Sequence, residues 1–384
     1  MRYETWEPLR CHAPARKERV TDLLECFAIA APGIEAITAR ELRALGAGEL
    51  APEPGGITFP ATPALLQDAN RRLRTASRVL VRVARFRART FFELERHATK
   101  LEWSRWLAAG MAPTFDVTSK KSKLYHEKGI AQRLMEAAGR ASADAAEQLF
   151  VVRVHRDEFT LSIDSSGELL HRRGYRQETA KAPMRETLAA AMLLGAEWDG
   201  QAPLVDPMCG SGTIPIEAAL IARRMAPGLE RGFAFMRWPG FDADAWREVH
   251  ARAESEVRVR SPVAIMGRDR DAGAVAAARE NARRAGVAGD VTFEEAALSA
   301  LSAEGGPGFL VSNPPYGVRV GEEARLRDLY ATLGKLVTQR LDGWTAALLT
   351  ANPRLDHATG LDWREVFRTS NGGIPVRLIV HTAI

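Results

Sequence analysis

The segment Asn313-Pro314-Pro315-Tyr316 places an amide, two prolines and an aromatic ring directly after the apolar run FLVS. Proline after Asn313 disfavours the helical region for that residue and removes a backbone donor, so the corner is rigid. Such a corner can offer two acceptors, the Asn313 side-chain oxygen and the Pro314 carbonyl, to the N–H bonds of an exocyclic amine on a nucleobase. The Tyr316 ring can stack on the same base. A rigid turn with a packed tyrosine is the alternative interpretation.

A second candidate site lies in the segment LVDPMCGSGT, where Asp206 ends an apolar strand and two glycines precede a helix. Glycine permits close backbone approach, and the helix N-terminus offers unpaired amides to an anion. With Asp206 for an ammonium group and the amides for a carboxylate, the loop fits the methionine part of S-adenosylmethionine (SAM). A nicotinamide site would need G-x-G-x-x-G, but Pro215 stands at the third glycine position. The predicted cofactor contacts of this loop are Asp206, Met208, Gly210, Gly212 and Thr213.

Acidic residues also end the next predicted strand, AIMGRDRD, ahead of an alanine-rich helix. A carboxylate at the end of the second strand of a nucleotide-binding sheet can accept both ribose hydroxyls, and this role is assigned to Asp269. Asp271 is expected to cap the following helix, and Arg270 is expected to lie across the adenine. Helix capping alone is the alternative interpretation of these residues.

The elements around these sites predict the fold. Strands and helices alternate singly from about residue 184, which indicates a mostly parallel sheet covered by helices on both faces. Ligands of such sheets bind beyond the carboxyl ends of the strands, where all three candidate sites fall. The segment REVFRTSNGGIPVRLIVHTAI predicts an antiparallel hairpin with an Asn-Gly-Gly turn. The first half of the chain is instead typical of an α+β module with antiparallel strands.

Composition sets the broad class of the protein. The chain of 384 residues is 46% hydrophobic and 26% charged, which is typical of a soluble protein with two or three domains. It has no apolar stretch long enough for a membrane span and no secretory signal at its N-terminus, so a cytoplasmic location is expected. Its three cysteines are scattered, which argues against a disulfide framework and a cysteine-built metal site. No metal is predicted.

A basic cluster of eight arginines lies between Arg71 and Arg89, with no acidic residue among them. Such a cluster attracts a polyanion, because phosphate contacts release condensed counterions. A solvated, arginine-rich surface is the alternative interpretation. The predicted RNA contacts of this cluster are Arg71, Arg72, Arg74 and Arg78.

The motifs together resemble those of class I SAM-dependent methyltransferases with an N-P-P-Y box, and more closely the THUMP-domain 23S rRNA guanine-N2 methyltransferases of the RlmL type. The resemblance begins near Cys26 and rests on HRRGYR, APMRETLAAAML, LVDPMCGSGTIPIEAA, RMAPGLERGF, GRDRDAG, SNPPYG and SNGGIPVRL. It implies methyl transfer from SAM to the N2 of a guanine in 23S rRNA or a large-subunit precursor, with S-adenosylhomocysteine (SAH) as the product. In its THUMP domain, which binds structured RNA, the further implied phosphate contacts are Lys120, Lys121, Lys123 and Arg133.

The resemblance also divides the chain. It implies a polar extension (1–25), a ferredoxin-like segment (26–65), a THUMP domain (66–168), a linker (169–183) and a class I methyltransferase domain (184–384) with a Rossmann-like α/β fold. The family usually has an aspartate after the third strand, which contacts the adenine amine. This chain has Ala297 there, so the backbone beside Leu298 is expected to contact the adenine. Some relatives carry a second methyltransferase domain. Because this chain stops at Ile384, a second modification is expected to need another protein.

Three other functions stay open at this point. The nearest is the same guanine-N2 chemistry on tRNA, because THUMP methyltransferases also modify tRNA guanines. A DNA adenine-N6 methyltransferase could use the same amine-holding corner. A non-catalytic ribosome assembly factor that only binds RNA is suggested by the missing acid at Ala297.

Overall fold

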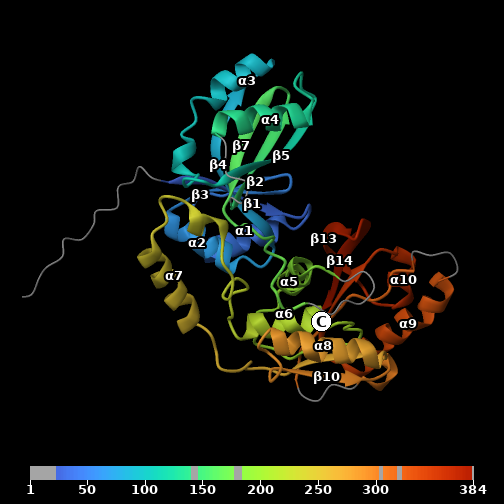
Figure 1. The fold of residues 1–384 in the computed structure, drawn as a ribbon. Coiled ribbons are helices and arrows are strands. Elements are labelled where there is room, and N and C mark those ends of the chain that lie inside the picture. The colour runs from blue at the N-terminus through green and yellow to red at the C-terminus, as the bar shows by residue number, and fades with distance from the viewer. Residues whose placement is uncertain (1–22, 140–145, 177–183, 302–305, 318–321, 383–384) are drawn as a thin grey trace, which may run out of the picture.

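The computed structural model describes residues 23–139, 146–176, 184–301, 306–317 and 322–382. Residues 1–22 of the predicted extension and residues 177–183 of the predicted linker lie outside these ranges. The described chain forms two lobes, each built on one seven-stranded sheet (Figure 1). None of the helices in the described ranges has the length and apolar character needed to cross a lipid bilayer.

The N-terminal lobe is an α+β unit. Its strands are β1 (Leu24–Ala30), β2 (Ala51–Glu53), β3 (Gly56–Ala61), β4 (Ala76–Arg87), β5 (Ala112–Lys120), β6 (Glu147–His155) and β7 (Glu158–Asp164). Its helices are α1 (Glu35–Ala44), α2 (Pro63–Arg72), α3 (Phe91–Ala98) and α4 (Glu127–Ala138), with a 3-10 turn η1 (Trp103–Arg105). Strand β1 buries Cys26, Ala28 and Ala30 in alternation, which is the period of a strand with one face on the core.

The N-terminal sheet has the order β2-β3-β1-β4-β7-β6-β5. Its strands pair antiparallel except for the parallel pair β5 and β6. The long strand β4 pairs with β1 on one side and with β7 on the other, so one sheet runs through both the predicted ferredoxin-like segment and the predicted THUMP domain. The domain boundaries derived from the sequence therefore stay predictions.

The C-terminal lobe is an α/β unit with the order β10-β9-β8-β11-β12-β14-β13 in its sheet. Its strands are β8 (Leu204–Asp206), β9 (Ile265–Asp269), β10 (Val291–Glu295), β11 (Phe309–Ser312), β12 (Thr345–Thr350), β13 (Arg364–Asn371) and β14 (Ile374–Thr382). Its helices are α5 (Glu186–Gly195), α6 (Thr213–Ala222), α7 (Ala243–Ser255), α8 (Ala272–Arg284), α9 (Glu322–Arg340) and α10 (Pro353–Ala358), with 3-10 turns η2 (Ala234–Arg237) and η3 (Leu298–Ala300).

The pairing of these strands confirms the predicted Rossmann-like fold with a C-terminal hairpin. The five neighbouring strands β10, β9, β8, β11 and β12 are parallel. Strand β14 runs antiparallel between β12 and β13. The β13–β14 turn is made by Gly372 and Gly373, with φ of 57° and 84°, the positive values that a two-residue hairpin loop of this kind requires. The order of the strands reverses between β8 and β11, and open α/β sheets bind their ligands at such a point.

An aromatic segment between α6 and β9 leaves the C-terminal lobe and packs on the N-terminal lobe, which the sequence analysis did not predict. In Figure 1 its helix α7 lies beside α2. Phe233 and Phe235 join the core of the N-terminal lobe. The indole of Trp238 donates a hydrogen bond to Oε1 of Gln148 at 3.0 Å. This segment therefore holds the two lobes together.

Arg71 is part of this contact between the lobes. Its side chain is fully buried, and its guanidinium lies 4.0 Å from the ring centre of Trp246 in α7. A buried guanidinium stacked on an indole is stabilised by a cation–π interaction and has no surface for a phosphate. The prediction that Arg71 contacts RNA is therefore wrong, because α7 covers it.

The other predicted arginines of the cluster are also bound within the protein. Arg72 pairs with Glu256 at 2.6 Å, and Arg78 pairs with the buried Asp164. Arg74 donates to the carbonyls of Leu220, in the last turn of α6, and of Met225, just beyond this helix, and so links the lobes. Because all three guanidinium groups are bound within the protein, the structure does not support the predicted contacts of these arginines with RNA.

Candidate active site

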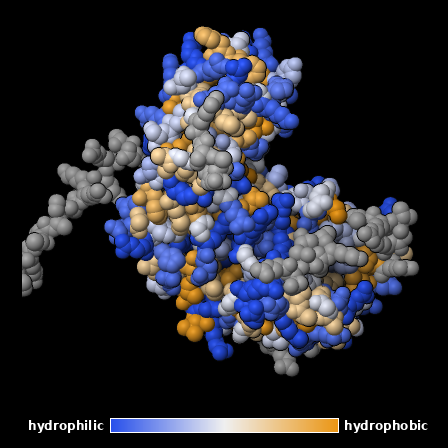
Figure 2. Space-filling view, viewed as in Figure 1, coloured by the Kyte–Doolittle hydropathy of each residue, from blue (hydrophilic) through white to orange (hydrophobic). Residues whose placement is uncertain are grey.

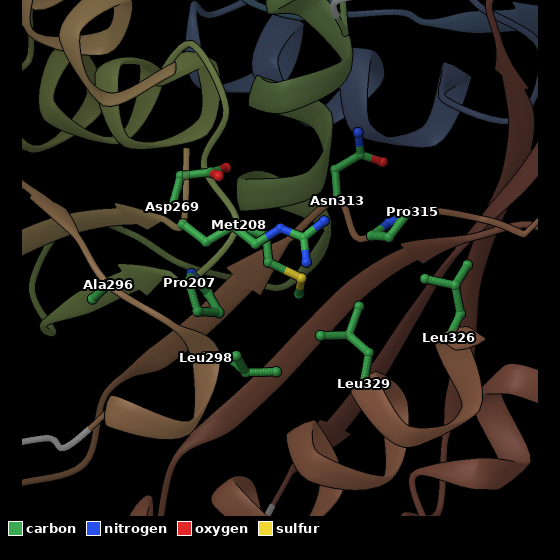
Figure 3. Close-up of a pocket in the computed structure, with 10 residues that line it drawn as sticks. Pro207, Met208, Asp269, Ala296, Leu298, Asn313, Pro315, Leu326 and Leu329 are labelled. Carbon is green, nitrogen blue, oxygen red and sulfur yellow. The ribbon is translucent and has the colours of Figure 1, made fainter. Parts of the chain in front are cut away.

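A cavity of about 650 Å³ lies at the carboxyl ends of the parallel strands of the C-terminal sheet. Figure 3 shows Asp269 and Asn313 on one side of this cavity and Leu298 and Leu329 on the other. The cavity is lined by Pro207, Met208, Asp269, Arg270, Ala296, Leu298, Asn313, Pro315, Leu326 and Leu329. The three segments singled out in the sequence therefore meet at one cavity, as the strand-end rule requires.

The glycine loop joins β8 to α6 below this cavity. Gly212 is the N-cap of α6 and has a φ of 83°, a left-handed value that favours glycine. A Cβ at Gly212 would lie 2.9 Å from Cβ of Ala278 and 3.0 Å from the ring of Phe293, so the loop could not keep this close packing with a side chain. No side chain caps the α6 N-terminus, but Gly210, Gly212 and Thr213 do not line the cavity, so their predicted cofactor contacts stay predictions. Thr213, the first residue of α6, is buried.

Asp269 faces the cavity from the end of β9 and also holds the glycine loop. Its Oδ2 accepts a hydrogen bond from the backbone N–H of Gly210 at 2.9 Å, and its Oδ1 accepts from the N–H of Asp271 at 3.0 Å. Asp271 in turn caps α8 by accepting from the amides of Gly273 and Ala274, which confirms its predicted capping role. Asp269 therefore joins the end of β9 to the loop after β8, and its predicted contact with a ribose stays a prediction.

Asp206 is buried beneath the loop and does not line the cavity. Its Oδ1 accepts hydrogen bonds from the hydroxyl of Ser312 at 2.6 Å and from the N–H of Met208 at 3.1 Å. Burial raises the pKa of Asp206 to about 7, although both hydrogen bonds lower it, and the nearby Asp269 carboxylate raises it further. A role for Asp206 toward an ammonium group stays a prediction, and its visible role is to tie β8 to β11.

The Asn313 corner is held from two sides. Pro314 is buried and Pro315 is exposed, and the Pro315 carbonyl accepts a hydrogen bond from the hydroxyl of Tyr330 at 3.1 Å. The hydroxyl of Tyr316 donates to Oδ1 of Asn313 at 2.5 Å. The Tyr316 ring packs against the core of the lobe, so it is fixed both at the ring and at the hydroxyl. Its predicted stacking on a base stays a prediction.

Two residues of this corner were missed by the sequence analysis. Tyr330 is fully buried in α9, and Asn371, at the end of β13, donates its Nδ2 to the Tyr316 hydroxyl at 3.0 Å. Tyr330 lies 15 residues from Pro315, and Asn371 lies 55 residues from Tyr316. In the sequence, Asn371 stands before the two glycines of the hairpin turn, and a role in that turn was enough to account for an asparagine there.

The part of the cavity wall next to Asp269 fits a purine. Ala296 and Leu298 give it an apolar surface, and Arg270 also lines the cavity. Ala297 itself is exposed at the N-cap of η3 and is not one of the lining residues. The residues before and after Ala297 therefore line the cavity, whereas the position where the family usually has an aspartate does not.

The lysines predicted to contact RNA lie on the N-terminal lobe. Lys120, Lys121 and Lys123 are exposed at the end of β5, whereas Arg133 is half-buried and pairs with Glu95 at 2.6 Å. Figure 2 shows hydrophilic residues over much of this lobe and in the notch between the two lobes. Unlike the buried Arg71, these lysines present their charge to solvent.

Cysteine and metal chemistry find no support among the described residues. Burial raises the pKa of the Cys209 thiol, which keeps it protonated and unreactive. Within the described ranges, no group of three or more His, Cys, Asp or Glu side chains could hold a metal ion.

The lining of the cavity fits the nucleoside half of SAM. Its volume is in the range of small-molecule pockets. Asp269 offers a carboxylate to the cavity, and Ala296 and Leu298 offer an apolar surface to a purine. The N-terminus of α6 does not line the cavity, so the predicted contact of its amides with a carboxylate stays a prediction. The strand order with its antiparallel β14 and this cavity together define a class I SAM-dependent methyltransferase.

Within that class, the chain belongs to the family of RMKL-like methyltransferase domains. The model of this family matches residues 173–378, and the model of the RlmL ferredoxin-like domain matches residues 25–80. These matches confirm the resemblance proposed from the motifs and the ferredoxin-like character of residues 25–80.

Individual relatives agree with this family. The Synechocystis sp. protein named "Putative RNA methyltransferase slr0064" is 35% identical over 92% of this chain and 95% of its own length. The "Ribosomal RNA large subunit methyltransferase K/L" of Syntrophotalea carbinolica is 39% identical over 93% of this chain, which spans 53% of that relative. The crystal structure of SMU.472, a methyltransferase by its name, in complex with SAH has a TM-score of 0.88 and 31% identity, and covers 95% of this chain and 99% of that one.

Proposed function

We propose that this protein transfers the methyl group of SAM to the exocyclic N2 of a guanine in 23S rRNA. The observation that carries the proposal is that Asn313 and Asp269 line one cavity, so the amine-holding corner and the cofactor-binding strand end share one space. The names of the relatives that act on large-subunit rRNA supply the substrate class.

The corner has the acceptors that the target amine needs. A carbonyl oxygen has two lone pairs, so Oδ1 of Asn313 can accept from Tyr316 and still accept one N–H of the amine. The Pro314 carbonyl is the second acceptor. Bonds to both N–H groups favour a pyramidal nitrogen, whose lone pair is then less delocalised into the base. When bound, SAM supplies an electrophilic methyl group on a positively charged sulfur.

Positioning carries most of this catalysis. Burial raises the pKa of Tyr316 to about 12, so its phenol is protonated at neutral pH and acts as a donor rather than as a base. The nitrogen of the guanine carries a positive charge after it has gained the methyl group, and it then loses a proton to solvent. Orientation and fixed dipoles therefore supply the rate enhancement.

The exposed lysines are proposed to dock the RNA. Lys120, Lys121 and Lys123 lie in one short segment, and two aromatic side chains on the same lobe, Phe92 and Tyr125, are 74% and 76% exposed. Lysines can neutralise phosphates, and exposed aromatic rings can stack on unpaired bases. This surface would position the RNA, while the Asn313 corner would choose the atom.

The proposal is tested with labelled SAM and separate pools of 23S rRNA, 16S rRNA, tRNA and DNA, followed by mass spectrometry of the nucleosides. The expected result is N2-methylguanosine in 23S rRNA from a strain that lacks the gene, and much slower transfer by an Asn313→Ala variant. Label in tRNA alone would show that the substrate is tRNA and not 23S rRNA. Binding of SAM and RNA without transfer to any pool would favour an assembly factor and overturn the proposal.

A further inference from the structure

Three side chains form a chain of hydrogen bonds behind the proposed target site. Nδ2 of Asn371 donates to the hydroxyl oxygen of Tyr316 at 3.0 Å, and this hydroxyl donates to Oδ1 of Asn313 at 2.5 Å. Asn313 lines the cavity, whereas Asn371 does not. Asn371 can therefore act on a bound base only through Tyr316.

The hydrogen bonds have one direction. A phenol has one proton, and an amide nitrogen can only donate. Because Nδ2 of Asn371 donates to the Tyr316 oxygen, the Tyr316 proton is free to point to Asn313. In that arrangement the Asn313 carboxamide must present its oxygen, and not its NH2 group, to the tyrosine.

This orientation matters for an amine target. A carboxamide that turns by half a rotation exchanges its oxygen for its NH2 group, which would face the N–H donors of the amine with further donors. We propose that Asn371 is a positioning residue for methyl transfer, which orients the Asn313 carboxamide through the Tyr316 hydroxyl. The inference rests on the proposed function, because it concerns how the target amine is held.

The hairpin that carries Asn371 is a firm support. Asn371 pairs with Ile374 across the β13–β14 turn, and β14 pairs with β12 from Arg377 to Thr382. Phe367 and Leu378 of the same hairpin are buried in the core against which Tyr316 packs. Asparagine is also a common turn residue next to Gly-Gly. An experiment must therefore distinguish a role of Asn371 in the turn from its proposed role in orienting Asn313.

Asn371→Asp makes that separation. Aspartate has nearly the shape of asparagine and suits the same turn, but an ionised carboxylate cannot donate to Tyr316. The carboxylate would instead accept a hydrogen bond from the Tyr316 hydroxyl, which would then no longer donate to Asn313. Tyr316→Phe removes the hydroxyl and keeps the ring. Ser370→Ala, at an exposed position in the same hairpin, is the matched control.

Single-turnover methylation of the RNA substrate is measured for these variants and for the double variant Asn371→Asp/Tyr316→Phe. We expect Asn371→Asp and Tyr316→Phe each to slow the reaction roughly tenfold, the double variant to be no slower than the slower single variant, and Ser370→Ala to match the wild type. Dissociation constants for SAM and RNA should stay within about twofold of wild type. Multiplied losses in the double variant, or a wild-type rate in Asn371→Asp, would overturn the inference.

A crystal structure of Asn371→Asp with SAH gives a readout that does not depend on activity. The Tyr316 oxygen is expected to move beyond about 3.5 Å from Oδ1 of Asn313, or the carboxamide is expected to rotate. An unchanged Tyr316–Asn313 contact would refute the positioning role. Absence of transfer by the wild-type protein would refute the proposed function instead, so the two failures are distinguishable.

Discussion

The hydroxyl of Ser312 donates a hydrogen bond to Oδ1 of Asp206 across 2.6 Å, with both side chains buried. Ser312 is the last residue of β11 and Asp206 the last residue of β8. The bond therefore joins the strand that leads into the glycine loop to the strand that leads into the Asn313 corner. Cofactor loop and target corner are fixed to each other by this contact.

Ser312→Ala should lower the free energy of unfolding by about 1–3 kcal/mol, because it leaves the buried Asp206 oxygen without one of its donors. Denaturant unfolding measures this change. The exposed Ser370→Ala control should change stability by less than about 0.5 kcal/mol. Equal stability of both variants would show that the Ser312 bond contributes nothing.

Asp206 should make stability depend on pH. Its pKa is about 7 in the folded protein and 3.8 in the reference state. Between these values the folded protein binds more protons than the unfolded chain, so stability falls as pH rises through this range. Asp206→Asn should therefore lose less stability than the wild type between pH 5 and 7 in urea unfolding. Asp164, whose pKa burial raises to about 6, acts in the same direction in both proteins. Identical pH profiles would contradict the assignment.

Asn313→Ala should lower the rate of methyl transfer by about 10²–10³-fold, because it removes an acceptor for the target amine. The binding of SAM and RNA should be nearly unchanged, since the loss concerns the transition state. Single-turnover rates and calorimetric titrations measure the two effects separately. A weaker affinity for SAM with a normal rate would assign Asn313 to the cofactor instead.

Asp269→Ala should raise the dissociation constant of SAM at least about tenfold, because it removes the proposed ribose acceptor and the bond to Gly210. Asp271→Ala is the matched control two residues away. It should cost about 1 kcal/mol of stability through the lost α8 cap and leave SAM binding intact. Calorimetry with SAM decides, and an equal loss of affinity in both variants would count against the ribose role.

Reversal of the three exposed lysines, Lys120, Lys121 and Lys123, to glutamate should weaken RNA binding and reduce the slope of log K against log salt by about 2–3. SAM affinity should not change. Lys335→Glu, an exposed reversal on α9, is the control for net charge. If the control and the triple variant change the slope equally per charge, the lysines are not a docking surface.

Many features of the site follow from local stereochemistry and were predictable. Two prolines make the corner after Asn313 rigid, and paired glycines make the β13–β14 turn, whatever the surrounding protein. Parallel strands bring their carboxyl ends to one edge of a sheet, so Asp269 and Asn313 had to meet once the alternation of strands and helices was recognised. These rules act over a few residues or along one sheet, and sequence spacing reveals them.

The fate of the arginines and the support of the corner depended on packing between distant segments. The same arginine-rich pattern serves a solvated surface or an interface between lobes, and only the docking of α7 buries Arg71 against Trp246. Likewise, only the folded hairpin brings Asn371 to the Tyr316 hydroxyl. Whether a polar side chain meets water or a protein partner is set by which element covers it, and this long-range choice leaves no local pattern in the chain.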